Sequence, residues 1–434
     1  MHDRLAEHYP PLTRHEALVE ADRCIYCYDA PCTHACPTHI DIPKFIKKIA
    51  TDNVSGSARA IFDSNLMGAT CARVCPVQEL CEGACVLNSE HKPIMIGRLQ
   101  RYAMDHAYST GQLPFQASVS KTSSVAVVGA GPAGLSCAGE LARRGYPVTV
   151  YEKRSLAGGL STYGIIGLRE PVPVALAEAG LIERLGVKLA TGQELGSNLK
   201  WDDLRKRHDA VFLAVGLGAT PDLGIPGEEQ ILDGLQYIEQ SKVDSNGGPR
   251  IGRHVVVIGA GNTAIDCATI AKRLGAETVT MVYRRTDHEM TAYPHEYDFI
   301  KKEGVEFRFL TQPTAVNIVD GQVTGLTCQR IMLGTADQSG RPTPIAIAGS
   351  EFVLDADQIV KAIGQKKPSL AAQIGIATDQ GYIRVTKQLE TSVPGVYAGG
   401  DAIRARGAAS TVMAVQDGKL AAQAIDAHLE SKHG

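Results

Sequence analysis

The chain has 434 residues, a formal net charge of -3 and 44 glycines, and aromatic residues make up only 5% of it. This length allows two or three domains, each with a core of its own. The near-neutral charge, the dispersed basic residues and the few aromatics argue against a partner made of nucleic acid or an anionic membrane. No stretch approaches the roughly twenty consecutive apolar residues that a membrane-spanning helix needs.

The N-terminal part is predicted to consist of short helices strung between cysteines. One helix is expected from Arg14, and another begins with Asp41 as its N-cap and Pro43 in its first turn. Such a small part of the chain, rich in glycine, proline and cysteine, has a thin core, so bound cofactors are expected to stabilise it. The polar residues 118–124 are predicted to form the linker that follows.

Eight of the eleven cysteines lie between residues 24 and 85. They form two runs, Cys24-x2-Cys27-x4-Cys32-x3-Cys36 and Cys71-x3-Cys75-x5-Cys81-x3-Cys85, and a proline follows Cys36 and Cys75. Thiolates at these spacings can converge on one inorganic cluster, and a Cys-Pro pair after a close run is typical of ferredoxins. The first hypothesis is therefore two iron-sulfur clusters.

Disulfides and structural zinc are the two simpler explanations of these cysteines. Disulfides need an oxidising compartment, whereas the N-terminus lacks the basic start and apolar run of a signal peptide, so a cytoplasmic location is expected. Zinc sites usually contain paired CxxC units or CxxC with HxxxH, and only Cys24 and Cys27 have that spacing. Zinc is thus disfavoured but stays open.

A complete dinucleotide-binding pattern follows the linker. An apolar run leads into Gly129-Ala-Gly131-Pro-Ala-Gly134 and a helical pattern, and the next apolar run ends at Glu152. The first glycine allows a tight turn, the second lets the backbone approach a pyrophosphate, the third lets helix and strand pack closely, and the acid can accept a ribose hydroxyl. A glycine turn without a ligand is the alternative, and the strand, helix and acid in place argue against it.

A second pattern of the same kind begins about 130 residues later. Gly259-Ala-Gly261-Asn-Thr-Ala264 follows an apolar run, and the next run ends at Arg284 and Arg285 rather than at an acid. Arginine accommodates a 2′-phosphate, whereas a carboxylate suits an unphosphorylated ribose. The first site is therefore predicted to bind FAD and the second NAD(P).

The C-terminal part is expected to rejoin the first nucleotide-binding domain. Residues 396–401 read as a strand ending in Gly-Gly-Asp, before a helix from Ser410 to about Leu429. An acid before a helix N-terminus can bind ribityl hydroxyls, although a plain turn is the alternative. The predicted fold is α/β, with an NAD(P) module inserted into a discontinuous FAD module, and the expected boundaries are a helical iron-sulfur domain at 1–117, an FAD domain at 118–225 and 359–434, and an NAD(P) domain at 226–358.

With these motifs, nearly the whole chain resembles the flavin-bearing subunits of bacterial dihydropyrimidine dehydrogenases, and the small subunit of glutamate synthase is the nearest cousin. Both families share the cysteine runs and the paired fingerprints. One position separates them: in Ile96-Gly-Arg-Leu-Gln100, dihydropyrimidine dehydrogenases carry the glutamine, whereas glutamate synthase subunits usually carry an acid.

The resemblance also implies the site residues. It assigns one [4Fe-4S] cluster to Cys24, Cys27, Cys32 and Cys85 and a second to Cys36, Cys75, Cys81 and Gln100, which leaves Cys71 as a packed cysteine. It places FAD on Gly129, Gly131, Pro132, Ala133, Gly134, Glu152, Gly159, Leu160, Arg169, Gly400, Asp401, Ser410 and Thr411. It places NAD(P) on Gly261, Asn262, Thr263, Ala264, Arg284, Arg285, Ala362 and Gly364. Thr291 stands where a relative carries a further arginine for the 2′-phosphate. This weakens the prediction that the site binds NADP and slightly favours NAD.

The function implied by the resemblance is electron input to the reduction of uracil and thymine. Hydride transfer from nicotinamide to flavin needs orientation more than a side-chain acid or base, so no catalytic side chain is expected. The implied partner is an FMN- and iron-sulfur-containing pyrimidine-reducing subunit, in a heterotetramer. The alternatives are a small subunit of NADPH-dependent glutamate synthase and a flavin scaffold whose clusters are structural.

Overall fold

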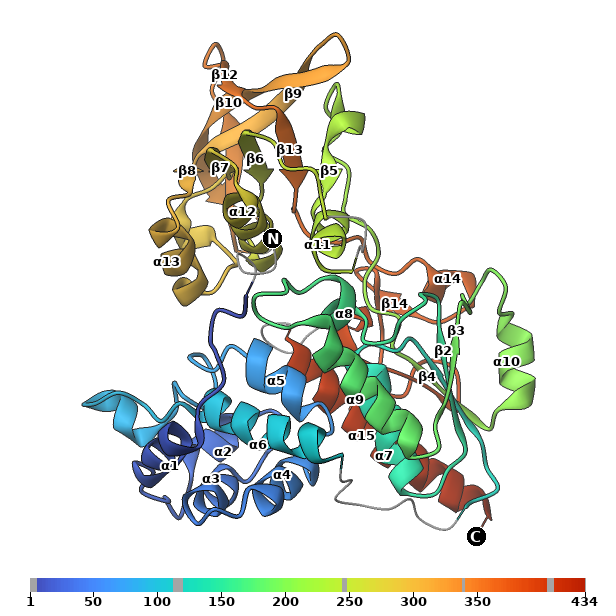
Figure 1. The fold of residues 1–434 in the computed structure, drawn as a ribbon. Helices are drawn as coiled ribbons and strands as arrows, with labels where there is room; N and C mark the ends of the chain where they lie inside the picture. The colour runs from blue at the N-terminus through green and yellow to red at the C-terminus, as the bar shows by residue number, and fades with distance from the viewer. Residues whose placement is uncertain (1–5, 112–119, 244–247, 338–339, 404–409, 434) are drawn as a thin grey trace. The chain divides into compact units, whose positions relative to one another are not determined.

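The structure, a computed structural model, describes residues 6–111, 120–243, 248–337, 340–403 and 410–433 (Figure 1). The chain divides into two compact units. The larger unit is formed by residues 8–162, 169–217 and 367–434, and the inserted unit is formed mainly by residues 218–366. The boundary expected at 117/118, and part of the expected linker, lie outside the described residues.

The larger unit begins with helices that connect the cysteines. Thr13 caps the first helix in a capping box with Glu16, and the Asp41 side chain accepts a hydrogen bond from the Lys44 amide, as expected of an N-cap. The helices of this part are α1 (Arg14–Asp22), α2 (Pro31–Ala35), α3 (Ile42–Ala50), α4 (Val54–Phe62), α5 (Gly68–Val74), the 3₁₀ turn η2 (Val86–Ser89) and α6 (Ile96–Thr110).

A parallel five-stranded sheet forms the rest of the larger unit. Its strand order is β16-β4-β1-β2-β3, and β1 and β4 are buried along their whole length, as strands covered on both faces are. The strands are β1 (Val125–Val128), β2 (Val148–Glu152), β3 (Lys188–Thr191), β4 (Ala210–Leu213) and β16 (Val396–Ala398). The helices are α7 (Pro132–Arg143), α8 (Leu160–Tyr163), α9 (Val172–Arg184), α10 (Trp201–Arg207), α14 (Leu370–Gln373) and α15 (Thr411–His433), and the small strands β14 (Thr378–Asp379) and β15 (Tyr382–Ile383) pair with each other.

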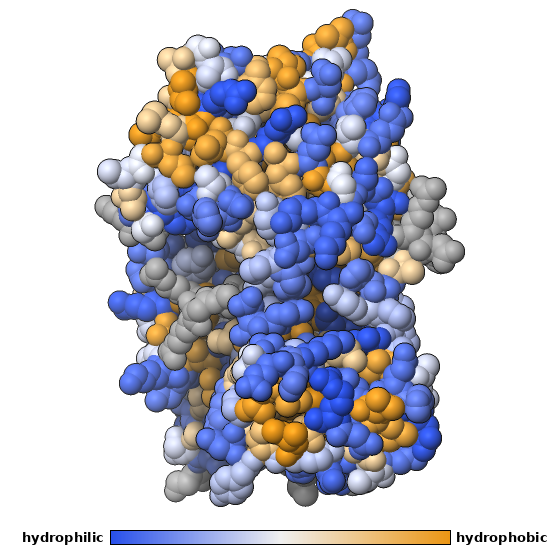
Figure 2. Space-filling model, turned by 90° about the vertical axis from the view of Figure 1, so that its left-hand side faces the viewer, coloured by the Kyte–Doolittle hydropathy of each residue, from blue (hydrophilic) through white to orange (hydrophobic). Residues whose placement is uncertain are grey.

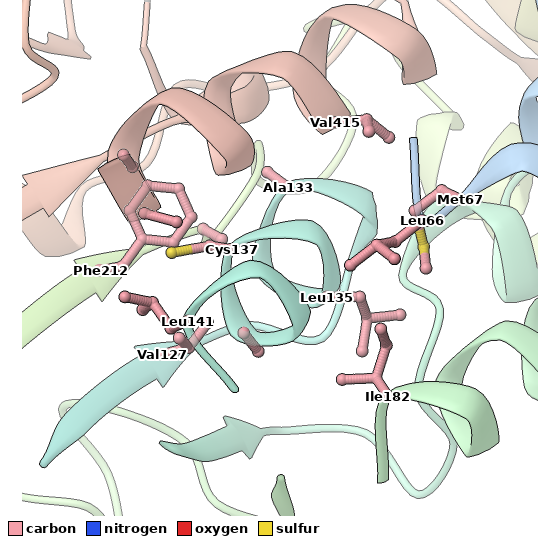
Figure 3. Close-up of a cluster of buried hydrophobic side chains, with 14 of the residues drawn as sticks. Leu66, Met67, Val127, Ala133, Leu135, Cys137, Leu141, Ile182, Phe212 and Val415 are labelled. Carbon is pink, nitrogen blue, oxygen red and sulfur yellow. The ribbon is translucent and has the colours of Figure 1, made fainter. Parts of the chain in front are cut away.

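The cysteine-bearing helices and the sheet share one hydrophobic core. Leu66 and Met67 lie against α7 and α9 beside Leu135 and Ile182 (Figure 3). Gly139 of α7 allows this contact, because a Cβ there would lie 2.6 Å from both the Leu66 and the Ile182 side chains. The N-terminal part is therefore packed onto the nucleotide-binding sheet and does not form a separate core.

Buried hydrogen bonds join α5 to α9 at the same junction. The Glu178 carboxylate of α9 accepts from the amides of Ala69 (2.7 Å) and Thr70 (3.1 Å) at the start of α5. The Thr70 hydroxyl contacts both Glu178 and Glu170, at 2.5 Å each, and both carboxyl groups are buried. The position of α5 is thus determined by polar contacts from the second half of the larger unit.

The inserted unit contains a second parallel sheet with the same arrangement and an antiparallel sheet. The parallel order is β5-β13-β6-β7-β8, and in the antiparallel sheet β10 pairs with β9, β11 and β12. The elements are β5 (Leu232–Asp233), α11 (Gly234–Lys242), β6 (His254–Ile258), α12 (Asn262–Leu274), β7 (Thr278–Val282), α13 (Pro294–Lys302), β8 (Glu306–Arg308), β9 (Thr311–Val319), β10 (Gln322–Ala336), β11 (Pro342–Ala346), β12 (Phe352–Asp355) and β13 (Gln358–Lys361).

The expected boundary between residues 358 and 359 needs correction. It would separate β13 from its sheet, whereas β13 pairs in parallel with both β6 and β5. The inserted unit extends to Lys366, which exchanges backbone hydrogen bonds with Gly218 and Ala219. Composition alone does not place β13, because the pairing of a buried strand, rather than its apolar character, decides which sheet it joins.

One face of the molecule has a mixed surface. On the face drawn in Figure 2, apolar side chains gather in small groups among polar and charged ones. Among the described residues, no helix combines the length and the apolar character needed to cross a membrane.

Candidate cofactor sites

Four thiols of the cysteine-rich part surround one cavity. Cys24, Cys27, Cys32 and Cys85 line it together with apolar side chains that include Ile42 and Ile46. Two of these cysteines come from the loop after α1, one from α2 and one from the residue before η2, so the fold brings together the set expected for the first cluster. Burial and the neighbouring thiols raise the pKa of Cys32 to about 11.

A second group of thiols lies deeper. A hydrogen bond with Cys71, burial, and the proximity of Cys81 and Cys36 raise the pKa of Cys75 well above its usual value, and burial raises the pKa of Cys81. The structure thus brings Cys36, Cys75 and Cys81 together as expected, but it also places Cys71 in direct contact with Cys75. All eleven cysteines are free thiols.

The first group has the ligands that a [4Fe-4S] cluster needs. Its four thiols surround one cavity, and each iron of such a cluster binds a separate ligand, commonly a cysteine thiolate. Within the described residues, no three His, Cys, Asp or Glu side chains are placed to hold a single metal ion. Burial penalises the charged form of these thiols, and a bound iron-sulfur cluster would stabilise them as thiolates.

Gln100 lies on α6 and is buried against α5, the helix that carries Cys71 and ends before Cys75. Its Nε2 donates a 2.8 Å hydrogen bond to the Gly68 carbonyl. This bond fixes the amide plane and leaves Oε1 as the atom with ligand character. The structure is therefore compatible with Gln100 as a ligand, and the assignment stays a prediction.

Glu82 is a residue of this region that the motifs did not indicate. Its carboxylate accepts a 3.0 Å hydrogen bond from the Gly97 amide in the first turn of α6, and burial raises its pKa to about 7. The contact fastens the loop that carries Cys81 to the helix that carries Gln100. A single acid next to a cysteine gives no recognisable sequence signal for such a role.

The first glycine turn forms the cradle that a dinucleotide needs. Gly129 has φ +103°, and Cβ atoms added at Gly129 and Gly134 would lie 2.3 Å and 1.9 Å from carbonyl oxygens. Gly131 is the N-cap of α7, where a Cβ would meet only Gly159, at 3.9 Å. The space in front of this helix N-terminus thus depends on two facing glycines, as expected for a pyrophosphate site.

Glu152 holds this turn together. One carboxylate oxygen accepts from the Ala130 amide (2.8 Å) and the other from the Arg154 amide (2.7 Å). The side chain therefore links the glycine turn to the segment that leads to Gly159. A carboxylate has further lone pairs that can accept from a ribose hydroxyl, as the sequence predicted.

The C-terminal part of the predicted flavin site lies on the same sheet. Gly400 has φ +68°, and its amide donates a 2.9 Å hydrogen bond to Asp417 of α15. Burial raises the pKa of Asp401 in the same turn. Ser410 and Thr411 stand at the start of α15, while the other members of the set, including Pro132, Ala133, Leu160 and Arg169, lie elsewhere in the larger unit.

The second glycine turn repeats this geometry in the inserted unit. Gly259 has φ +130°, and a Cβ there would lie 2.2 Å from the Ala362 carbonyl. Gly261 is the N-cap of α12, and the Thr291 hydroxyl lies 3.1 Å from where its Cβ would be. The fold thus brings the expected Ala362 next to the turn; Asn262, Thr263 and Ala264 form the first turn of α12, and Gly364 follows β13.

The two arginines after β7 differ in their surroundings. Arg284 is exposed, whereas Arg285 is buried, donates a 2.8 Å hydrogen bond to the Pro342 carbonyl and lies 3.7 Å from Asp337. The end of β7 therefore presents Arg284 to solvent, while Arg285 fastens the β10–β11 hairpin. The contact of both arginines with a nucleotide, which the resemblance implies, stays a prediction.

Two family profiles match the chain. Residues 1–112 match the profile described as dihydropyrimidine dehydrogenase domain II, 4Fe-4S cluster, and residues 123–418 match that of the pyridine nucleotide-disulphide oxidoreductases. The expected cofactors, [4Fe-4S] iron, FAD and NAD(P)H, are those of such proteins.

Curated relatives match over nearly the full chain. The NAD-dependent dihydropyrimidine dehydrogenase subunit PreT of Escherichia coli is 33% identical, covering 98% of this chain and 97% of its own. The glutamate synthase [NADPH] small chain of the same organism is also 33% identical, covering 98% and 94%. The putative oxidoreductase AegA, again from Escherichia coli, is 34% identical over 96% of this chain, which spans only 66% of AegA.

A solved structure supports the same fold. FprA from Mycobacterium tuberculosis, in complex with NADPH, superposes with a TM-score of 0.60 at 18% identity over 72% of this chain and 86% of that chain. With the two glycine turns and the cysteine-lined cavity, these matches show that the chain belongs to the pyridine nucleotide-disulphide oxidoreductase family and is an NAD(P)-dependent flavin and iron-sulfur oxidoreductase.

Proposed function

We propose that this chain is the electron-input subunit of a dihydropyrimidine dehydrogenase. It oxidises NAD(P)H at FAD and passes electrons through two [4Fe-4S] clusters to an FMN- and iron-sulfur-containing partner, which reduces uracil and thymine to 5,6-dihydropyrimidines. The observation that carries the proposal is Gln100, a buried amide fixed by Gly68 against α5 at the position where glutamate synthase subunits usually carry an acid. The full-length match to PreT supports the same reading.

The residues of the chain bind and orient the cofactors, and none needs to act as an acid or base. When bound, the flavin supplies the chemistry that converts a two-electron hydride donor into single electrons for iron-sulfur clusters. The glycine turn at Gly131 and the acid Glu152 fit the dinucleotide, and the turn at Asp401 fits the ribityl side. Cys24, Cys27, Cys32 and Cys85 are proposed to hold the first cluster, and Cys36, Cys75, Cys81 and Gln100 the second.

NADH is the nucleotide that we favour as the electron donor. Two observations support this preference: Arg285 is engaged by Pro342 and Asp337, and Thr291 stands beside Gly261 where a relative carries another arginine. A single exposed arginine, Arg284, gives little preference for NADPH. Initial rates of flavin reduction with the two nucleotides test this preference.

The small chain of glutamate synthase is the competing function. Its identity to this chain equals that of PreT, so overall similarity does not separate the two. The partner does: a pyrimidine-reducing subunit with FMN is expected, in a heterotetramer in the cytoplasm, whereas a very large amidotransferase would support the competitor. A scaffold role, with structural clusters only, predicts no electron transfer at all.

Isolating the partner and assaying the pair tests the proposal. The tagged chain is purified anaerobically from its own organism, and NADH oxidation is followed with uracil or with glutamine and 2-oxoglutarate. Uracil-dependent oxidation supports the proposal, and glutamine-dependent oxidation overturns it. Anaerobic addition of NADH to the chain alone is expected to bleach the flavin absorbance, and an unbleached flavin excludes the oxidoreductase role.

Two cysteine variants test the ligand assignment within the second group. Cys75→Ser is expected to remove the iron of one cluster, because a proposed ligand is lost. Cys71→Ser is the matched control, since it removes the neighbouring thiol, on α5, and is expected to keep the iron content of the wild type. Loss of one cluster in Cys71→Ser with a normal iron content in Cys75→Ser would contradict the assignment.

A further inference from the structure

A lysine on helix α15, in the nucleotide-binding part of the larger unit, contacts the cysteine-rich part. The Lys419 ammonium donates 3.1 Å hydrogen bonds to the Thr38 and Ser64 carbonyls, and its side chain is half-buried. Burial lowers the pKa of Lys419, while Glu140 and Cys36 act in the opposite direction. A cation is thus placed within electrostatic reach of Cys36.

The two acceptor carbonyls belong to the segments that shape the Cys36 turn. The His39 amide donates to the Cys36 carbonyl (2.9 Å), and His39 has φ +54°, so the chain reverses tightly after the cysteine. Thr38 is fully buried, and its hydroxyl lies 3.4 Å from the Cys36 sulfur. The Ser64 hydroxyl in turn donates to the His39 carbonyl, so Lys419 closes the link between residues 38–39 and 64.

The nearest acid does not draw the Lys419 ammonium away from this turn. Glu140 of α7 lies close enough to affect Lys419, but its carboxylate already pairs with Arg143 (3.3 Å) and Arg144 (2.7 Å). The hydrogen bonds of Lys419 go to neutral carbonyls. Its positive charge therefore acts on whatever negative charge Cys36 carries.

The same helix also contacts the predicted flavin site. Asp417, two residues before Lys419, accepts from the Gly400 amide in the turn that contains Asp401. The Ser136 hydroxyl of α7 donates to the Val415 carbonyl (2.8 Å), and a Cβ at Gly418 would lie 2.2 Å from the Ala133 carbonyl. These contacts fix the position of α15 along α7, and they therefore fix the position of Lys419 relative to the Cys36 turn.

We propose that Lys419 positions the Cys36 turn and raises the reduction potential of the cluster that Cys36 helps to hold. A cation beside a cluster stabilises the state that has gained an electron, because net charge and hydrogen bonding set cluster potentials. Lys419 thereby makes the second cluster a better electron acceptor than the same cluster would be without the lysine charge. The inference rests on the ligand assignment made under the proposed function.

The test compares Lys419→Met, which keeps the aliphatic stem and loses the charge, with Lys419→Arg, which keeps the charge. Both holoproteins are purified anaerobically, and their clusters are titrated by EPR-monitored potentiometry. We expect the equilibrium constant for reduction of the second cluster to fall at least tenfold in Lys419→Met, a shift of about 59 mV for one electron. The first cluster and the flavin content are expected to stay unchanged, and Lys419→Arg is expected to titrate close to the wild type.

Lys121→Met is the matched control, because Lys121 also bonds to α15, at Asp426 and Glu430, on a different stretch of the helix. An unchanged second-cluster potential in an iron-replete Lys419→Met protein overturns the proposal, as does an equal shift in Lys121→Met. Selective iron loss in Lys419→Met that Lys419→Arg restores supports the positioning role, and loss that it does not restore counts against it. A wild-type protein with one cluster signal refutes the ligand assignment itself, a failure distinct from that of Lys419.

Discussion

The buried acids at the junction between α5 and α9 predict a specific dependence of stability on pH. The Thr70 hydroxyl lies 2.5 Å from both Glu178 and Glu170 but has one hydrogen to donate, so one carboxyl group must hold a proton. Burial raises the pKa of Glu178 from its ordinary value of 4.5 to about 8, and Glu170 contributes as a neighbouring acid. Proton binding at this site thus favours the folded state.

The sign of the effect follows from this raised pKa. Since the folded state holds the proton more tightly than the unfolded state, the stabilisation is complete below about pH 4.5 and is lost as the pH rises through about 8. The difference of about 3.5 pKa units, at 1.36 kcal/mol per unit, sets an upper limit of about 5 kcal/mol. Sharing of the proton with Glu170 reduces this to about 2–4 kcal/mol.

Glu178→Gln tests this reasoning, because an amide keeps the shape of the protonated acid and does not ionise. Urea unfolding of the holoprotein, followed by circular dichroism, is compared between variant and wild type from pH 5 to pH 9. The variant is expected to gain about 2–4 kcal/mol relative to the wild type across this range. Glu183→Gln, on the exposed side of the same helix, is the control and should show a constant difference. Parallel curves for Glu178→Gln and the wild type would refute the argument.

Three further predictions concern the cofactor sites. Gly134→Ala is expected to lose both flavin and thermal stability, because its Cβ would lie 1.9 Å from a carbonyl oxygen. Gly131→Ala, whose added Cβ would have its nearest neighbour at 3.9 Å, should keep its melting temperature and lose at least tenfold in flavin affinity. Equal losses of melting temperature in the two variants would contradict this prediction. Arg284→Ala should raise the KM for NADPH severalfold and leave the KM for NADH unchanged. Arg285→Ala should lower the free energy of unfolding by about 1.5–3 kcal/mol, because its hydrogen bond is lost. The reverse pattern would show that Arg285 binds the 2′-phosphate. Gln100→Ala should disturb one cluster and leave the flavin bound, and unchanged iron content and cluster spectra would defeat its assignment as a ligand.

Much of the fold was predictable because its signals are local. Both glycine turns, the strands before them and the acid Glu152 follow one another in the sequence, so spacing alone predicts two nucleotide sites. The cap at Asp41 is confirmed for the same reason, since it depends on a short pattern.

The features that could not be predicted from the sequence depend on contacts between segments that lie far apart in the chain. The membership of β13 in the second sheet is set by its pairing with β6, and the withdrawal of Arg285 is set by a hairpin more than fifty residues away. The contacts of Glu178 and Lys419 with the cysteine-rich part span 108 and 381 residues. No periodicity or spacing marks such residues, because an acid or a lysine on a helix is usually a solvated side chain.

The order in which the ribosome releases these segments gives the link between Lys419 and Thr38 a biosynthetic consequence. At about 5–20 residues per second, the 381 residues between them take roughly 20–80 s to synthesise. During that time β16 and α15 are absent, so neither the edge of the first sheet nor the brace on the Cys36 turn exists. We therefore expect the Cys36 turn to reach its final geometry, and the second cluster to be held firmly, only after the last helix has emerged.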